Sequence, residues 1–340
     1  MPDKLRAVLV GCGSISGAWL SAPTVKTRVD IVGLVDIRKD AAEAKAREFA
    51  IDGAAVGTDL DSILKATRPD AVFDCTVPEA HCGVTLTALK YGCHVLGEKP
   101  LADTIANARK MVAAAKRAKR IYAVIQNRRY QNEIRALRAF LDSGRIGAVT
   151  SVQTNFFLGA HFGGFRDRMK HVLLLDMAIH TFDAARFVTR ADARSVYCHE
   201  WNPAGSWYDH DASAVAVFEM TRGIVYTYQG SWCAEGCNTT WEADWRVTGT
   251  KGSVLWDGAR SFRAEAPKRA VRFIRPVRSL RVPVRAIKRS GHDGVIGEFV
   301  DCVTKGGVPN TVCTDNIKSL AMVHAAVESA GKAHKVSVRI

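Results

Sequence analysis

The segment 173–186 (LLLDMAIHTFDAAR) contains an aspartate and a histidine at a spacing that suits proton transfer. In a helix, Asp176, His180 and Asp183 share one face, because residues four and seven apart stack along it. Burying these polar side chains among apolar neighbours costs free energy unless they are paired or used. A carboxylate beside an imidazole fixes the tautomer of a proton-transferring histidine. Taken alone, the segment is explained equally well by a buried polar pair without a catalytic task.

A glycine-rich turn near the N-terminus has the spacing of a dinucleotide-binding loop. Gly11, Gly13 and Gly17 follow a short apolar strand and open a helix. The first glycine permits a tight turn, and the second lets the backbone approach a pyrophosphate at the start of the helix. Ser16 occupies the third position of the G-x-G-x-x-G pattern, and glycine follows one residue later.

Asp36 ends the second predicted strand, 25 residues beyond Gly11. A carboxylate about 20 residues after the glycines binds the adenosine ribose hydroxyls and repels the 2′-phosphate of NADP, which favours NAD. Arg38 and Lys39 follow closely, so NADP remains an alternative cofactor. The other interpretation of Asp36 is an ordinary turn residue at a strand end.

Two further motifs follow buried strands, at the edge where open α/β sheets bind ligands. Residues 76–78 (TVP) follow the strand expected at 71–75, and residues 98–100 (EKP) follow the strand expected at 94–96. A lysine placed against a carboxylate at such an edge can bind, protonate or deprotonate a substrate oxygen. Taken alone, the EKP motif indicates only a surface loop.

The chain has 340 residues, of which 47% are hydrophobic and 24% charged, as expected of a globular protein with two domains. No apolar run reaches the roughly 18–20 residues of a membrane span, and the N-terminal residues do not resemble a signal peptide. Nine scattered cysteines without a CxxC pair predict reduced thiols in the cytoplasm and no structural metal. The net charge of +14 is concentrated at 267–290, where nine basic residues alternate with apolar ones, a pattern that favours a basic surface over nucleic-acid binding.

Strand and helix signals alternate along the first part of the chain, which predicts a doubly wound parallel sheet. Its expected strands are 7–10, 30–35, 71–75, 94–96 and 122–125. Longer strands with short turns follow, which predict an α+β domain on a large, mostly antiparallel open sheet. Those strands are expected at 149–157, 193–200, 213–220, 223–231, 240–248 and 252–256. We therefore expect a dinucleotide-binding domain at 1–126 and a second domain at 127–340.

The order of these motifs resembles the glucose–fructose oxidoreductase/inositol dehydrogenase (Gfo/Idh/MocA) family. The resemblance is carried by GCGSISG, VDIR, CTVPEAH, GEKP, QNRRY and LLLDMAIHTFD, and it extends to the closing GVIGEFVDCV and CTDNIKSLAMVHAAVESA segments. It implies an N-terminal Rossmann domain that binds NAD(P), and a C-terminal domain that builds the substrate site. Through its open sheet, that second domain is expected to form a homodimer or homotetramer. Ser16 and Ala178 stand where the family often has glycine.

The resemblance also implies roles for individual residues. The expected catalytic residues are Lys99, Asp176 and His180, with His180 as the acid/base and Lys99 between the nicotinamide and the substrate. The expected cofactor contacts are Gly11, Cys12, Gly13, Ser14, Ile15, Asp36, Ile37, Thr76, Pro78, His81, Glu98, Lys99, Gln126 and Asn127. The expected substrate contacts are Lys99, Arg129, His161, Asp176 and His180. Two of these residues have alternatives of equal weight: a helix start for His81, and a solvated position in a loop for His161. Arg166 and Arg168 are expected at the surface.

The expected reaction is reversible hydride transfer between the nicotinamide and a secondary alcohol or hemiacetal carbon of a sugar, sugar acid or cyclitol. One alternative is an NAD-assisted glycosidase or eliminase that recycles a tightly held cofactor. The non-enzymatic alternative is a dinucleotide-dependent sensor, which would be expected to lack Lys99 or His180. No metal, nucleic-acid or membrane partner is expected.

Overall fold

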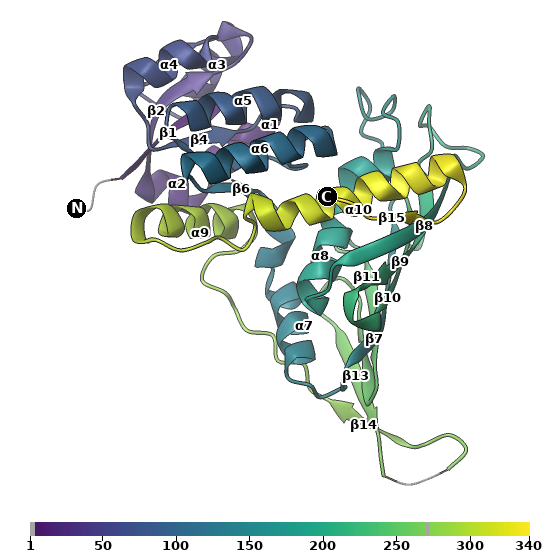
Figure 1. Ribbon diagram of the computed structural model, residues 1–340. Coiled ribbons are helices and arrows are strands. Elements are labelled where there is room, and N and C mark those ends of the chain that lie inside the picture. Colours follow the sequence, from purple (N-terminus) through teal and green to yellow (C-terminus); the bar gives the residue numbers. More distant parts are fainter. Residues whose placement is uncertain (1–3, 270–271) are drawn as a thin grey trace. The chain divides into compact units, whose positions relative to one another are not determined.

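The computed structural model (Figure 1) describes residues 4–269 and 272–340 of the chain, which divides into two compact units. Unit 1 runs from the start of the described chain to Tyr130 and from Lys288 to Leu320, and unit 2 comprises Gln131–Ile287 and Ala321–Ile340. The chain thus leaves unit 1 close to the predicted boundary at residue 126. It returns there for residues 288–320, which the sequence pattern had assigned to the second domain. Residues 270 and 271 of the basic segment lie outside the described residues.

Unit 1 contains a six-stranded parallel sheet in the order β3-β2-β1-β4-β5-β6, which confirms the predicted doubly wound sheet. The strands are β1 (Leu5–Val10), β2 (Val29–Val35), β3 (Ala55–Gly57), β4 (Ala71–Asp74), β5 (His94–Gly97) and β6 (Tyr122–Val124). The central strands β1 and β4 are almost wholly buried, because helices cover both faces of such a sheet.

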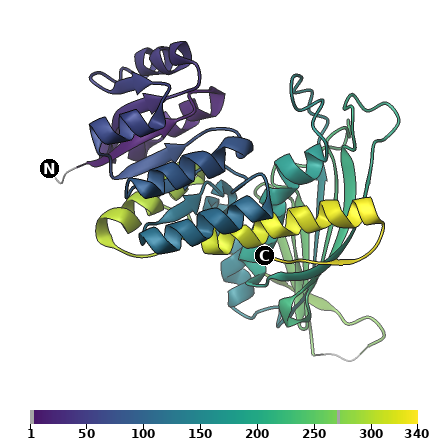
Figure 2. The same cartoon turned by 45° about the horizontal axis from the view of Figure 1, so that its top comes forward.

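The helices of unit 1 connect the parallel strands and cover the sheet, and α5 packs beside α6 in both views (Figures 1 and 2). They are α1 (Ser14–Leu20), α2 (Pro23–Arg28), α3 (Lys39–Glu48), α4 (Leu60–Thr67), α5 (Pro78–Lys90), α6 (Ile105–Ala118), η1 (Asn127–Tyr130) and α9 (Gly291–Lys305). The last helix, α10 (Cys313–Lys332), has 20 residues and continues from unit 1 into unit 2. Among the helices of the described chain, none has both the length and the apolar character that crossing a bilayer requires.

Helix α9 belongs to unit 1 because both its polar and its apolar side chains find partners there. The Asp293 carboxylate accepts a hydrogen bond of 2.7 Å from the backbone N–H of Thr24. Phe299 packs edge-on against Phe73 of β4, with ring centroids 6.2 Å apart. Both aromatic side chains are fully buried, so α9 completes the core of the parallel sheet.

Asp301 of α9 is surrounded by three cations. Its carboxylate lies 2.9 Å from Arg28 Nη2 and 3.0 Å from Lys305 Nζ, and it also accepts a hydrogen bond from Arg289. Burial opposes ionisation of the carboxyl, but these hydrogen bonds outweigh burial and lower its pKa to about 2. The cluster therefore attaches both the returning chain and α2 to one ionised carboxylate.

Unit 2 contains a nine-stranded sheet in the order β14-β13-β12-β11-β7-β10-β9-β8-β15. Its strands are β7 (Val149–Phe157), β8 (Ala193–Trp201), β9 (Ser213–Met220), β10 (Val225–Ser231), β11 (Asp244–Gly249), β12 (Gly252–Trp256), β13 (Phe262–Pro267), β14 (Val277–Leu280) and β15 (Val336–Ser337). The β7–β10 pair is parallel and the other pairs are antiparallel, which confirms the predicted mostly antiparallel sheet.

Helices α7 (Asn132–Asp142) and α8 (Ile179–Thr189) lie on one face of this sheet, and a π-helical turn η2 (Leu173–Ala178) leads into α8 (Figures 1 and 2). A short turn η3 (Thr221–Gly223) joins β9 to β10. Phe182 of α8 anchors the packing, with its ring 4.9 Å from Phe218 of β9 and 5.2 Å from Tyr228 of β10. The opposite face carries none of the described helices of unit 2 in either view.

The cation cluster generates a prediction for stability. Asp301→Asn should lower the free energy of unfolding by about 1 kcal/mol at pH 7, a value discounted for the partly exposed carboxylate. Because the pKa of Asp301 is lowered in the folded chain, its stabilisation is complete above about pH 5 and is lost as the pH falls towards about 2. Urea unfolding of both proteins at pH 7 and pH 3 measures this difference, with Asp52→Asn as an exposed control in the same unit. If Asp301→Asn lowered the free energy of unfolding equally at pH 7 and pH 3, the ionised Asp301 carboxylate would not be the source of the stabilisation.

Candidate active site

The glycine turn of unit 1 is shaped by a close contact between two strand ends. Gly11 has a φ of +87°, and a Cβ atom there would lie 2.7 Å from the carbonyl carbon of Cys75. A side chain is therefore excluded both by the backbone conformation and by the turn after β4. Gly13 has open space where its Cβ would be, so a ligand can approach this backbone. Ser16, in place of the family's glycine, is buried and donates a hydrogen bond of 2.6 Å to the Gly13 carbonyl.

Asp36 is held rigidly beside this turn. Its Oδ2 accepts a hydrogen bond of 2.7 Å from the backbone N–H of Cys12, and its Oδ1 accepts one of 2.9 Å from Arg38 N. Each carboxylate oxygen has two acceptor sites, so capacity remains for two ribose hydroxyls. Asp36 thus does more than end a strand, because it connects β2 to the glycine turn.

Several predicted cofactor residues are exposed around this edge of the sheet. The exposed residues are Gly13, Ser14, Ile15 and Ile37. Ile37 is 93% exposed and the neighbouring motif residue Val77 is 63% exposed. Large apolar side chains left in solvent at a loop edge are explained when a ligand covers them. The edge therefore fits a bound dinucleotide.

His81 connects two of the predicted motifs. Its Nε2 lies 3.1 Å from the Thr76 carbonyl oxygen, and its Nδ1 lies 3.0 Å from the Pro100 carbonyl oxygen. The side chain is 1% exposed. These contacts show His81 joining the turn after β4 to the EKP loop, and they lend no support to the predicted cofactor contact.

Glu98 fixes the backbone of the predicted catalytic lysine. Its Oε1 accepts a hydrogen bond of 2.8 Å from the indole Nε1–H of Trp19, and its Oε2 accepts one of 3.1 Å from Lys99 N. Trp19 is fully buried and Glu98 nearly so, whereas Lys99 is half-buried. A buried carboxylate thereby connects α1 to the loop that carries Lys99. Sequence reasoning missed Trp19, because nothing local marks it as a partner of a residue 79 positions later.

Gln126 and Asn127 close the same edge of the sheet at the end of β6. Within the described chain, neither polar atom of the Gln126 amide has a hydrogen-bond partner, although this side chain is 1% exposed. Asn127 Nδ2 lies 3.3 Å from His292 Nδ1 of α9. Burial lowers the pKa of this histidine, and the Glu98 carboxylate opposes that shift. Buried amide groups without partners are the kind of group that a bound cofactor satisfies.

Arg129, a predicted substrate contact, is engaged inside unit 1. Its Nη2 donates a hydrogen bond of 2.7 Å to Asp315 and its Nη1 one of 2.6 Å to the Asn310 carbonyl. The residue is 4% exposed. This geometry gives Arg129 a structural task and does not support contact with a substrate.

In unit 2, Asp176 and His180 lie in a helical segment that is mostly buried. The half-buried positions of this segment are His171, Leu175, Asp176 and His180. Their spacing of four to five residues follows the wider period of the π-helical turn η2, a feature that is frequent at functional sites. Asp183, predicted on the same face, is instead buried, and its Oδ1 lies 3.9 Å from Arg186 Nη1. The π-turn therefore separates Asp183 from the accessible pair.

Arg166 pairs directly with the predicted catalytic aspartate. Its Nε lies 2.9 Å from Asp176 Oδ2. Its guanidinium also lies 4.9 Å from the ring centre of Phe162 and 4.8 Å from that of Phe165. Arg166 is half-buried at the surface, with its side chain 32% exposed, and it also takes part in the candidate site, which was not predicted from the sequence. The signal that was missed is the pair of phenylalanines that precede the arginine, Phe162 and Phe165.

His161, the remaining predicted substrate contact, lies on the surface of unit 2. Its ring stacks on Trp207 with centroids 3.7 Å apart, and its Nε2 lies 3.0 Å from Glu235 Oε1. The histidine side chain is 61% exposed. It is accessible to a substrate, and its position in the loop is fixed by the tryptophan.

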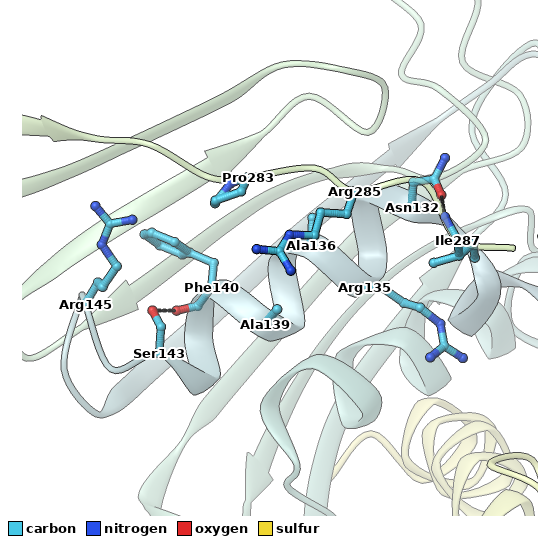
Figure 3. A pocket seen from close by; sticks show the side chains of 10 residues that line it. All are labelled: Asn132, Arg135, Ala136, Ala139, Phe140, Ser143, Arg145, Pro283, Arg285 and Ile287. Carbon is cyan, nitrogen blue, oxygen red and sulfur yellow. Dashed lines mark hydrogen bonds between the residues drawn. The ribbon is translucent and has the colours of Figure 1, made fainter.

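A pocket of about 430 Å³ lies between α7 and the end of the basic segment, and Figure 3 shows its lining. The described residues that line it are Asn132, Arg135, Ala136, Ala139, Phe140, Ser143, Arg145, Pro283, Arg285 and Ile287, none of them a predicted site residue. Arg135 and Arg145 extend to opposite sides, and Arg285 lies across the helix near Ala136. Because the arginines do not converge, the pocket offers no common point for an anion.

Comparison with known proteins assigns both halves of the chain to the same family. A sequence model described as "Oxidoreductase family, NAD-binding Rossmann fold" (Gfo/Idh/MocA) matches residues 5–126, and the model of the Gfo/Idh/MocA C-terminal domain matches residues 134–255. Together they match more than two thirds of the chain.

The chain is also similar to individual proteins over most of its length. It is 25% identical to 1,5-anhydro-D-fructose reductase of Ensifer adhaerens, covering 95% of each chain. It is 26% identical to D-apiose dehydrogenase of Paraburkholderia graminis, covering 99% of this chain and 90% of the relative. The names of both relatives describe net redox reactions rather than glycoside cleavage or sensing. The fold matches an oxidoreductase from Agrobacterium radiobacter crystallised with NAD⁺, L-tartaric acid and magnesium, with a TM-score of 0.84, 20% identity and 98% of each chain covered.

The glycine turn offers a test with a matched control. Gly11→Ala should lower the melting temperature by roughly 5–15 °C, because the methyl group meets backbone atoms at a positive φ. Gly17→Ala should leave the melting temperature unchanged or raise it slightly, because its Cβ finds ordinary contacts within a helix. Circular dichroism melts of the two variants measure the contrast, and equal melting temperatures would refute the proposed close contact.

Proposed function

The chain belongs to the Gfo/Idh/MocA family of oxidoreductases and carries its NAD-binding Rossmann domain, and on this premise we propose that it oxidises and reduces polyhydroxylated small molecules. Hydride passes between NAD and a secondary alcohol or hemiacetal carbon of a sugar, sugar acid or cyclitol. NADP is the alternative cofactor. The observation that carries the proposal is the buried Glu98, which fixes the backbone of a half-buried lysine beside the edge where the dinucleotide binds.

The residues of unit 1 bind and orient the cofactor. The backbone at Gly13, which has open space where a Cβ would be, would hold the pyrophosphate, and Asp36 would accept hydrogen bonds from the adenosine ribose. The buried amide of Gln126 and the side chain of Asn127 supply further polar contacts. NAD⁺, when bound, supplies the nicotinamide that accepts hydride from the substrate carbon.

Three side chains transfer the proton of the substrate hydroxyl or stabilise the charge on its oxygen. During oxidation His180 removes the hydroxyl proton through Nε2, because its Nδ1 is buried, and the Asp176 carboxylate stabilises the resulting imidazolium. The Lys99 ammonium stabilises the negative charge that develops on the substrate oxygen. In the direction of reduction the same groups return the proton. This assignment retains Lys99, Asp176 and His180 as the catalytic residues.

We also propose that the open face of the nine-stranded sheet forms a homodimer or homotetramer. Tyr197 of β8 and Val217 of β9 are cross-strand neighbours on this face, and they are 46% and 38% exposed. Exposed apolar side chains grouped in this way mark contact surfaces. Sedimentation analysis distinguishes dimer from tetramer. The nine free cysteines suit a reducing compartment, and we propose the cytoplasm.

The catalytic assignment is tested by removing one group at a time. Lys99→Ala and His180→Ala should each lower kcat by about 10²–10⁴-fold, because each group acts on the proton or charge of the reacting oxygen. The dissociation constant for NAD⁺, measured by fluorescence titration, should change by less than about threefold. Turnover is followed as NADH absorbance with a sugar or polyol found by screening. Lys116→Ala, an exposed lysine of α6, is the control, and normal turnover in both active-site variants would refute the assignment.

Cofactor preference is tested at Asp36. Asp36→Ser should lower kcat/KM for NAD⁺ by about 10–100-fold, because hydrogen bonds from the ribose to a charged group are lost. The ratio of kcat/KM for NADP⁺ to that for NAD⁺ should rise, because the carboxylate no longer repels the 2′-phosphate. Asp40→Ser, at an exposed position in the first turn of α3, controls for the loss of charge. An unchanged ratio in the Asp36 variant would count against the predicted ribose contact.

A further inference from the structure

One end of the Arg166 guanidinium has no hydrogen-bond partner in the part of the chain that the structure describes. Its Nε donates to Asp176 Oδ2 at 2.9 Å. Among the residues that the structure describes, its Nη1 and Nη2 make no hydrogen bond. The side chain is 32% exposed, so solvent or a ligand reaches this end. Two adjacent N–H groups of a planar cation are therefore available next to the predicted catalytic aspartate.

Aromatic packing holds this cation in place. The guanidinium lies 4.9 Å from the ring centre of Phe162 and 4.8 Å from that of Phe165. Phe162 in turn packs edge-on against Trp232 at 5.2 Å, and Trp232 is 1% exposed. The guanidinium is thus supported from the core of unit 2, which limits the conformational entropy lost when a ligand binds.

The geometry selects among possible ligand groups. The Nη1 and Nη2 ends of a guanidinium match the two oxygens of a carboxylate, and such charge-assisted pairs are about twice as strong as neutral hydrogen bonds. Asp176 neutralises part of the arginine charge, but residues 161–180 contain three basic and two acidic residues. The stretch that carries Arg166 thus has a formal net charge of +1, which favours an anion over a cation.

We propose that Arg166 binds the carboxylate of an acidic sugar, an aldonate or a uronate, through Nη1 and Nη2 while its Nε remains on Asp176. This inference rests on the proposed function and narrows its substrate class. Arg166 then both recognises the acid group and positions Asp176. The reacting hydroxyl and the carboxylate belong to the same substrate, so recognition of the acid also orients the carbon that loses hydride.

The test compares acids with their neutral counterparts. We would measure kcat/KM with NAD⁺ for D-gluconate against D-glucitol, D-glucuronate against D-glucose, and D-galacturonate against D-galactose. The unmodified protein should prefer the acid by about 10–100-fold in at least one pair, with the difference mainly in KM. Arg166→Gln should abolish the preference and Arg166→Lys should reduce it. The ratio of kcat/KM between the acid and its neutral counterpart is not changed by a general loss of activity from a misplaced Asp176, because that loss lowers kcat/KM for both sugars.

The matched control is Arg168→Gln, an exposed arginine of the same loop that should keep the full preference. The inference would be overturned if Arg166→Gln kept the preference for the acid, or if the unmodified protein preferred the neutral member of every pair. Oxidation of any of these sugars would leave the proposed function intact in either case. If no member is oxidised, the proposed function fails for these sugars. In that case calorimetric titration of the NAD⁺-loaded protein with D-gluconate and D-glucitol still decides the inference. The inference is rejected if D-gluconate binds no more tightly than D-glucitol, or if Arg166→Gln does not weaken the binding of D-gluconate.

Discussion

The cofactor unit depends on one buried carboxylate. An ionised glutamate in the protein interior is costly unless hydrogen bonds compensate for its lost hydration. Glu98 meets this requirement with an indole N–H from α1 and the backbone N–H of Lys99. The glycine turn, the helix that follows it and the EKP loop must therefore assemble together. Gly11 imposes a second constraint of the same kind, since its lack of a side chain lets the turns after β1 and β4 touch.

Sequence patterns predicted the features that depend on neighbouring residues. The parallel sheet follows from buried strands separated by helices, and the position of Asp36 follows from its spacing after the glycines. Features that join distant residues were not predictable. The Trp19–Glu98 and Asn127–His292 contacts connect residues 79 and 165 positions apart, and no local pattern marks either pair. Strands β3, β13, β14 and β15 were missed as well. β3, β14 and β15 have only two to four residues, which carry little periodic signal, whereas β13 has six.

The segment that contains Asp176 and His180 shows what the sequence could predict of the site and what it could not. Its spacing indicated two polar residues on an apolar helix, and the structure leaves both of them half-buried. The sequence did not reveal the π-helical turn, because one extra residue per turn is encoded by packing rather than by residue type. It also did not reveal Arg166, whose role depends on two aromatic rings and a carboxylate ten residues later. Polar groups near a site were thus predictable, whereas their connections were not.

The division of unit 1 into two stretches of chain has a consequence for biosynthesis. The first stretch ends at Tyr130, and the ribosome must add Gln131–Ile287 before the second stretch appears. At about 5–20 residues per second, this interval lasts roughly 8–30 s. During that time the nascent parallel sheet lacks Phe299 against Phe73 and the cation cluster around Asp301. The dinucleotide-binding unit therefore begins to fold first and is completed only after strands β7 to β14 of the large sheet have been synthesised.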